Sequence, residues 1–290
     1  KELGIINRPL YVVPSNLVSQ FGQDILKFYP TKNVLVATKE DFQKQNRKRF
    51  FARIISSNYD GIVMGQSQFS KLNLSAEYRR DFINDRIEEL VAFKDHASGI
   101  ATVKDIQSSL RSLKSRLDQL KFQQQDQMIT FEDLGIDFLF VDEAHNYKNI
   151  APKTSKGRIR GINQTTAKKA MDMLMKVRYI QKHYDCTHIV FATGTPVSNS
   201  ISEIWTMMDY IQPDVLEKMG IGAFDSFANS FGLIKSVMEL NTTGDKYRTV
   251  LRFVKFVNLP EIMNIYKRTT DICMAYNLKL NLPKAKRFVV

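Results

Sequence analysis

Two adjacent carboxylates close an apolar run near the middle of this chain, at Asp142 and Glu143. Residues 138–141 before them have no polar face, which is typical of a strand that is buried on both sides of a parallel sheet. Open α/β sheets bind ligands at the carboxyl ends of such strands. Phosphoryl transfer is one reaction that uses a pair of acids at this position, because it needs charge neutralisation and a positioned water. We therefore assign Asp142 to Mg²⁺, held through water, and Glu143 to the attacking water as its base.

A second apolar run ends in hydroxyl and glycine residues. Residues 188–192 lead into Thr193, Gly194 and Thr195, about one strand-and-helix unit beyond the acids. If both runs are parallel strands of one sheet, their carboxyl ends lie at the same edge. We then expect the acidic end at Asp142 to face the hydroxyl end at Thr193 across a nucleotide.

Taken in order, the Asp-Glu-Ala-His tetrad at 142–145 and the Gly-Thr-Pro triplet at 194–196 resemble motifs II and III of superfamily 2 helicases. The continuation through 197–213, with its Glu-Ile-Trp triplet, is similar to the Snf-type, chromatin-remodeller-like branch. Residues 131–135 and 252–261 look like the large helicase-like proteins of phages and conjugative elements. This resemblance implies the first RecA-like lobe of a DNA-dependent ATPase that uses ATP and Mg²⁺ and translocates on duplex DNA.

The resemblance also gives roles to residues beside the acids. His145, Thr193, Gly194 and Thr195 would couple the nucleotide state to the grip on DNA, through hydrogen bonds between the acid loop and the neighbouring strand end. The alternative for His145 is a neutral histidine in a local network. None of the 4 histidines pairs with another at metal-ligand spacing, so we expect no zinc site.

Two more strand ends carry short polar residues, after the apolar runs at 10–13 and 61–64. These ends are similar to motifs Ia and Ib, where backbone N–H groups and short side chains meet a nucleic-acid phosphate. The alternative at the first is a plain strand-to-helix turn capped by Ser15 or Asn16. The residues that we assign to nucleic acid here are Pro14, Ser15, Asn16, Gln66 and Ser67.

The stretch from 148 to 169 is basic and almost free of apolar residues. Such a loop beside a catalytic strand end suits a phosphate backbone, although a solvated loop explains it equally well. From this stretch we assign Lys148, Arg158 and Arg160 to nucleic acid, together with Asn199 from the segment after the second strand.

The chain is predicted to be α/β, with a RecA-like parallel sheet covered by helices on both faces. Residues 106–120 place apolar side chains at steps of four and three, which indicates an antiparallel helical hairpin. Self-packing is its simplest function, and DNA or a protein partner are alternatives. A strand hairpin is expected within 237–251. The predicted segments are lobe one, first part (1–73), the inserted helical arm (74–128), lobe one, second part (129–222), and a helical and hairpin appendage (223–290).

Composition sets broad limits. The 290 residues carry a net charge of +12, which favours polyanionic partners without requiring them. The 2 cysteines show neither a zinc nor a disulfide pattern. No apolar run approaches the roughly 20 residues of a membrane span. We expect a soluble, cytoplasmic protein without a membrane partner.

The sequence contains no Gly-x-x-x-x-Gly-Lys-Ser/Thr phosphate loop. By the resemblance, that loop lies a few tens of residues before the motif Ia strand, and a second RecA-like lobe with an arginine finger lies after residue 290. We therefore expect a longer natural protein, of which this chain is a partial lobe that hydrolyses ATP poorly alone, with a gap in the sheet between the strands ending at Asp142 and Thr193. The alternative is a non-catalytic nucleic-acid-binding or interaction module that retains the fold.

Overall fold

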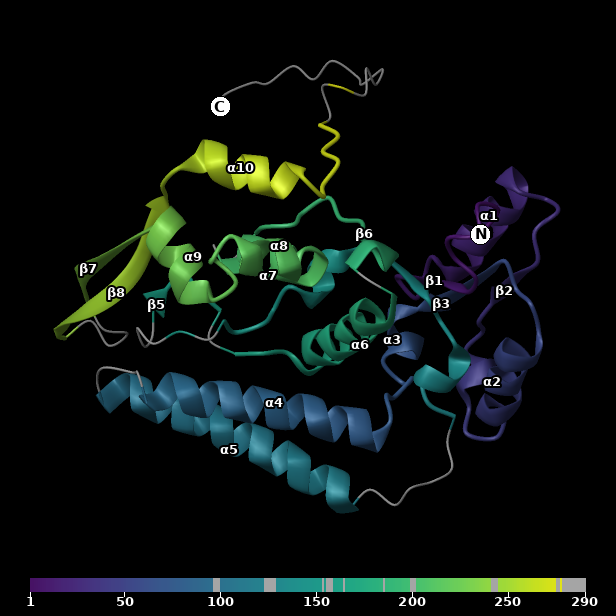
Figure 1. The fold of residues 1–290 in the computed structure, drawn as a ribbon, viewed down its shortest axis with the longest axis horizontal. Coiled ribbons are helices and arrows are strands. Elements are labelled where there is room, and N and C mark those ends of the chain that lie inside the picture. Colours follow the sequence, from purple (N-terminus) through teal and green to yellow (C-terminus); the bar gives the residue numbers. More distant parts are fainter. Residues whose placement is uncertain are drawn as a thin grey trace.

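The computed structural model describes residues 1–95, 100–122, 129–152, 154, 159–163, 165–184, 186–198, 202–240, 245–274 and 277. Five strands form one sheet in the order β2-β3-β1-β4-β6, and every neighbouring pair is parallel (Figure 1). All five carboxyl ends therefore lie at one edge. The strands are β1 (Pro9–Val13), β2 (Val34–Val36), β3 (Gly61–Gly65), β4 (Phe138–Val141) and β6 (Ile189–Phe191).

Helices cover both faces of this sheet, because side chains alternate along each strand. On β1, Leu10 and Val12 belong to the main core, whereas Tyr11 and Val13 belong to a smaller core under the first helix. The predicted α/β class is confirmed. The helices on the two faces are α1 (Val18–Phe28) over the smaller core, and α2 (Arg47–Ser56) and α6 (Lys168–Tyr184) over the main core.

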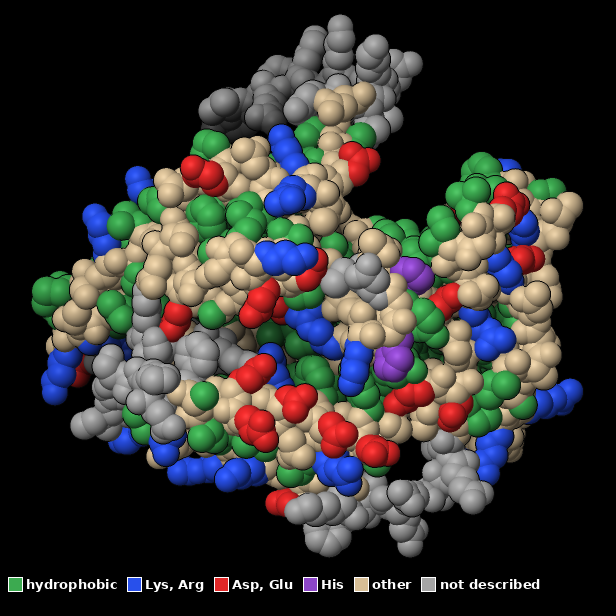
Figure 2. Space-filling model, viewed as in Figure 1, with side chains coloured by type: hydrophobic (Ala, Val, Ile, Leu, Met, Phe, Trp, Pro, Cys, Tyr) green, Lys and Arg blue, Asp and Glu red, His purple; other side chains and the backbone are tan. Residues whose placement is uncertain are grey.

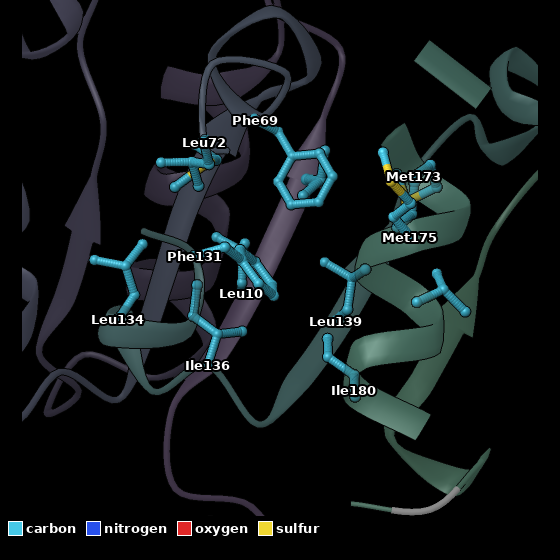
Figure 3. Packing of buried hydrophobic residues seen from close by; sticks show 14 of the residues in the cluster. Leu10, Phe69, Leu72, Phe131, Leu134, Ile136, Leu139, Met173, Met175 and Ile180 are labelled. Atoms are coloured by element: carbon cyan, nitrogen blue, oxygen red, sulfur yellow. The ribbon is translucent and has the colours of Figure 1, made fainter. Parts of the chain in front are cut away.

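Aromatic and aliphatic side chains from distant parts of the chain meet in the main core. Figure 3 shows Leu10 of β1 and Leu139 of β4 beside Phe131, with Met173 and Ile180 of α6 on the other side. Tyr210 is also fully buried, and its hydroxyl donates to the backbone oxygen of Ala170 at 2.8 Å. This core fixes the strands whose ends carry the polar residues.

The predicted gap between the strands ending at Asp142 and Thr193 is wrong. β4 and β6 pair directly, with Leu139 opposite Ile189 and Val141 opposite Phe191. β6 and β2 are the two outer strands of the sheet, and neither has a partner among the described strands on its far side. The sequence indicated which segments are strands, but strand order depends on contacts between distant segments.

The predicted arm consists of α4 (Ala76–Asp95) and α5 (Ile100–Phe122), which lie side by side in Figure 1. Their seam buries Ile83 and Leu90 against Ile106 and Leu113, so the arm packs on itself. At its base the Tyr78 ring meets Tyr179 of α6 edge to face, 5.4 Å between centroids. Figure 2 shows acidic side chains along α4, beside a hollow in the surface.

A second, three-stranded sheet has the order β5-β8-β7 and packs on its own core. Trp205 and Phe224 lie in that core, with rings 5.6 Å apart. The expected hairpin is present, since β7 and β8 are antiparallel. The elements of this part are β5 (Ile159–Arg160), α7 (Ser202–Ile211), α8 (Pro213–Lys218), α9 (Phe224–Phe231), β7 (Gly232–Leu240), β8 (Tyr247–Phe256) and α10 (Leu259–Lys267).

The short elements α3 (Gln66–Phe69), η1 (Glu40–Phe42), η2 (Glu132–Leu134), η3 (Ala144–Tyr147) and η4 (Cys186–His188) complete the described structure. No helix in the described ranges combines the length and the apolar character needed to cross a membrane.

Candidate functional site

The two acids lie where β4 leaves the sheet. The backbone N–H of Asp142 still donates to the Val12 oxygen of β1 at 2.8 Å, so its position is fixed by the sheet. Its carboxylate Oδ1 accepts the backbone N–H of Glu143 at 2.9 Å. Both acids are half-buried at the carboxyl edge of the sheet, the position where open parallel sheets bind ligands.

Glu143 adopts a left-handed backbone conformation, with φ of 49°. This conformation costs a non-glycine residue roughly 1 kcal/mol or more, and it recurs at functional sites where the surrounding structure enforces it. Here the sheet holds Asp142 on one side and the short helix η3 begins at Ala144 on the other. The turn leaves the Glu143 carboxylate partly exposed and 3.0 Å from Nδ1 of His145.

His145 joins the two strand ends. Its Nδ1 also lies 3.0 Å from Oγ1 of Thr193. Because a carboxylate only accepts hydrogen bonds, contact with Glu143 favours the tautomer that carries the proton on Nδ1. The Ala144 N–H donates to the Ala192 oxygen at 3.0 Å as well. The acidic and hydroxyl ends lie at one edge of the sheet, as the sequence predicted, but they are in direct contact and not separated by a gap.

Gly194 and Thr195 lie exposed just beyond this junction. The Thr195 N–H donates to Thr193 Oγ1 at 3.1 Å, so the same hydroxyl that meets His145 also shapes the loop after β6. This arrangement provides a bonded path from the acid loop to the segment predicted to sense the nucleotide.

Asp142, the residue to which the sequence assigned Mg²⁺, provides a carboxylate at this edge. Among the described residues, no cluster of three or more His, Cys, Asp or Glu side chains surrounds a common point. Mg²⁺ typically binds through one or two carboxylates, waters and substrate phosphates. Asp142 fits that pattern as a single half-buried carboxylate facing the open edge.

Gln66 connects the end of β3 to the acid loop. Its Nε2 donates to the backbone oxygen of Asp142 at 2.9 Å, and its Oε1 accepts from Nδ2 of Asn146 at 3.2 Å. Sequence reasoning assigned Gln66 to nucleic acid and did not foresee this bridge. Asn146 was missed altogether, although it directly follows the acidic tetrad.

Ser15 and Ser67, predicted from separate strand ends, meet at the surface. Their hydroxyl oxygens are 2.9 Å apart, and both residues are exposed. Gly65 makes this approach possible, because a Cβ there would lie 2.9 Å from Ser15 Oγ. With Pro14 and exposed Asn16 next in the chain, these residues form one polar surface directly beside Gln66.

Lys148 does not belong to that surface, which corrects the sequence prediction. Its ammonium group is 3.1 Å from Glu203 Oε2, and the two side chains are only 7% and 0% exposed. It also donates to Ser198 Oγ at 2.6 Å. A nucleic-acid phosphate has no access to a lysine that is enclosed in this way. Instead, the pair ties the acid loop to α7 and to the loop after β6.

The basic stretch is likewise not one solvated loop. Ile159 and Ile162 are buried in the second core, and Arg160 lies on β5 of the second sheet. Arg160 is therefore exposed on a different element from Ser15 and Ser67. Arg158 and Asn199, the other two residues assigned to nucleic acid, lie outside the described residues.

Comparison with known proteins identifies the family. The family model described as "Probable helicase domain" matches residues 1–274. The chain belongs to this family. It is also similar to the "Defense against restriction protein B" of Escherichia phage P1, with 26% identity over 231 residues. That match covers 77% of this chain and 10% of the phage protein, so the chain spans about a tenth of the length of this curated relative.

Proposed function

We propose that this helicase-like chain is part of the first motor lobe of an ATP-driven translocase of the Snf-type branch, acting on duplex DNA. The observation that carries the proposal is the junction of β4 and β6, where His145 lies within 3.0 Å of both Glu143 and Thr193. It places a carboxylate pair, an imidazole and a hydroxyl at one ligand-binding edge of a parallel sheet.

In this proposal each polar residue has a separate task. Asp142 would hold Mg²⁺ through water, and the ion would supply positive charge beside the phosphates of ATP. Glu143 accepts a proton from the attacking water. His145 orients Glu143 and connects it to the loop after β6 through the contact with Thr193. The phosphate loop and the second lobe would come from further sequence of the same natural protein.

The surface made by Ser15, Ser67 and Asn16 would hold the DNA backbone. Short hydroxyl and amide side chains at strand ends are common phosphate contacts. Gln66 follows β3 next to Ser67 and bonds the acid loop, so a shift at this surface reaches Asp142 through one hydrogen bond and Asn146 through a second. This path gives a physical basis for stimulation of hydrolysis by DNA.

The function is tested by ATP hydrolysis with Mg²⁺, with and without duplex DNA. We expect DNA-stimulated turnover by the longer natural protein and little turnover by these 290 residues alone. If the longer protein binds DNA without hydrolysing ATP, the non-catalytic binding module is the better description. Robust turnover by the 290 residues alone would contradict the proposal that the phosphate loop lies elsewhere.

Replacement of Gln66 by alanine is expected to uncouple DNA binding from hydrolysis. The variant loses the bonds to Asp142 and Asn146, each worth about 0.5–1.5 kcal/mol, whereas Ser15 and Ser67 keep their contact. DNA stimulation of kcat should fall about tenfold, with the Kd for DNA within about twofold of wild type.

Two companion variants sharpen this test. Gln66→Glu keeps an acceptor for Asn146 but loses the donor to the Asp142 oxygen, so it should resemble the alanine variant if that donor matters. Gln20→Ala changes an exposed glutamine on α1 and serves as the matched control. Undiminished DNA stimulation in both Gln66 variants would exclude Gln66 from the coupling path.

A further inference from the structure

The second sheet has one strongly basic side. In an antiparallel pair, residues directly opposite one another lie on the same side of the sheet. Lys235 of β7 is opposite Arg252 of β8, and Glu239 is opposite Arg248. On the other edge of β8, Arg160 of β5 is in register with Arg252. We call these five residues the basic face.

Ion pairs hold this face in place. Arg160 Nε is 3.1 Å from Glu239 Oε2, and Arg252 Nε is 3.0 Å from Glu239 Oε1. Glu239 is only 18% exposed, whereas the two arginine side chains are 43% and 48% exposed. One carboxylate therefore fixes two guanidinium groups, and each retains N–H donors that face solvent.

The charge of the basic face is unbalanced. Four cations surround one anion, which leaves a net charge of +3 from 4 − 1. Lys235 and Arg248 are exposed, and neither forms an ion pair with any residue in the described ranges. Such a surface attracts a polyanion.

The other side of the ribbon formed by β7 and β8 is different. Met238, Leu240 and Tyr247 are exposed there, toward the end of the ribbon away from the second core. At the left of Figure 2, where Figure 1 shows this ribbon, basic and hydrophobic side chains lie close together at the surface. Residues on the basic side and on the apolar side of this ribbon can therefore be substituted separately.

We propose that the basic face binds the phosphate backbone of duplex DNA, as a contact separate from the surface around Ser15 and Ser67. The choice of DNA as the polyanion rests on the proposed function. Arg248 and Arg252 are four residues apart, which is about 13–14 Å along a strand. This span is several times the 3.4 Å axial spacing of phosphates on one DNA strand, so the two arginines can contact different phosphates.

The test is the salt dependence of duplex DNA binding by the intact natural protein. The double variant Lys235→Ala with Arg248→Ala removes two cations that hold no ion pair in the described structure, so the fold should be preserved. We expect the slope of log K against log salt to shrink by about 1.8, or 0.9 for each lost contact. Affinity near 0.1 M salt should fall on the order of tenfold or more.

Two control variants test which side of the sheet binds DNA. Glu239→Gln raises the charge by one and should leave binding at least as tight as in wild type, whereas Met238→Ser with Leu240→Ser alters only the apolar side and should keep the wild-type slope. A wild-type slope in the Lys235 and Arg248 double variant overturns the inference. Equal competition by poly-glutamate and duplex DNA, at equal charge, also overturns it in favour of an acidic protein partner.

The outcomes separate this inference from the proposed function. If the protein binds DNA through the basic face but does not hydrolyse ATP, the inference about the basic face holds and the proposed motor function is contradicted. If DNA stimulates ATP hydrolysis but the double variant has an unchanged salt slope, the motor function holds and the inference about the basic face is contradicted. Wild-type protein that binds no DNA contradicts both.

Discussion

Replacement of Glu143 by glutamine should reduce ATP hydrolysis about 10²–10⁴-fold while nucleotide binding is retained, because it removes a general base without removing a ligand contact. Glutamine has the same length as glutamate and, like glutamate, is unbranched at Cβ. The left-handed conformation at φ 49° therefore costs it no more than it costs glutamate. Asp142 and its bond to the backbone N–H of residue 143 stay in place.

The prediction is checked in the longer natural protein by single-turnover hydrolysis with Mg²⁺ and by a separate titration of ATP binding. Glu88→Gln, an exposed and isosteric neutralisation on α4, is the control and should hydrolyse ATP at the wild-type rate. If the Glu143 variant turns over ATP at the wild-type rate, Glu143 is not the base. If the variant loses ATP binding, Glu143 contributes to the binding of ATP in the ground state and not only to the transition state.

Strand ends were predictable because a parallel strand that is buried on both faces has a distinct sequence. The runs ending at Val141 and Phe191 are apolar, and polar residues follow at Asp142 directly and at Thr193 after Ala192. Parallel topology places both ends at one edge of the sheet, whereas the direct contact between His145 and Thr193 depends on β4 and β6 being neighbours, which the local patterns did not predict.

Other features depend on contacts that no local pattern reveals. β5 has only two residues, and its strand character comes from pairing with β8, far along the chain. Charge patterns assume that lysines are solvated, yet Lys148 is buried because Glu203 lies opposite it. Glu203 belongs to the Glu-Ile-Trp triplet after the second strand, so a carboxylate directly before the apolar residues Ile204 and Trp205 was the available signal.

Breaking the pair between Lys148 and Glu203 should cause the largest loss of stability among these variants. In Lys148→Met, the buried Glu203 carboxylate loses the ammonium group that lies 3.1 Å from it, at a cost of about 3–5 kcal/mol. The melting temperature should fall by about 10 °C for a domain of this size. Glu203→Gln should cost less, because the amide oxygen still accepts the Ser198 N–H that Glu203 Oε2 accepts at 2.7 Å.

Asp214→Asn is the matched control, since it removes an exposed ion pair with Lys218 and should change stability by no more than about 0.5 kcal/mol. The buried pair also makes a prediction about DNA. Because Lys148 is enclosed, Lys148→Met should leave the salt slope of DNA binding unchanged, unlike the variants of the basic face. A reduced slope with an unchanged melting temperature would mean that Lys148 meets phosphate after all, and that the contact with Glu203 opens when DNA binds.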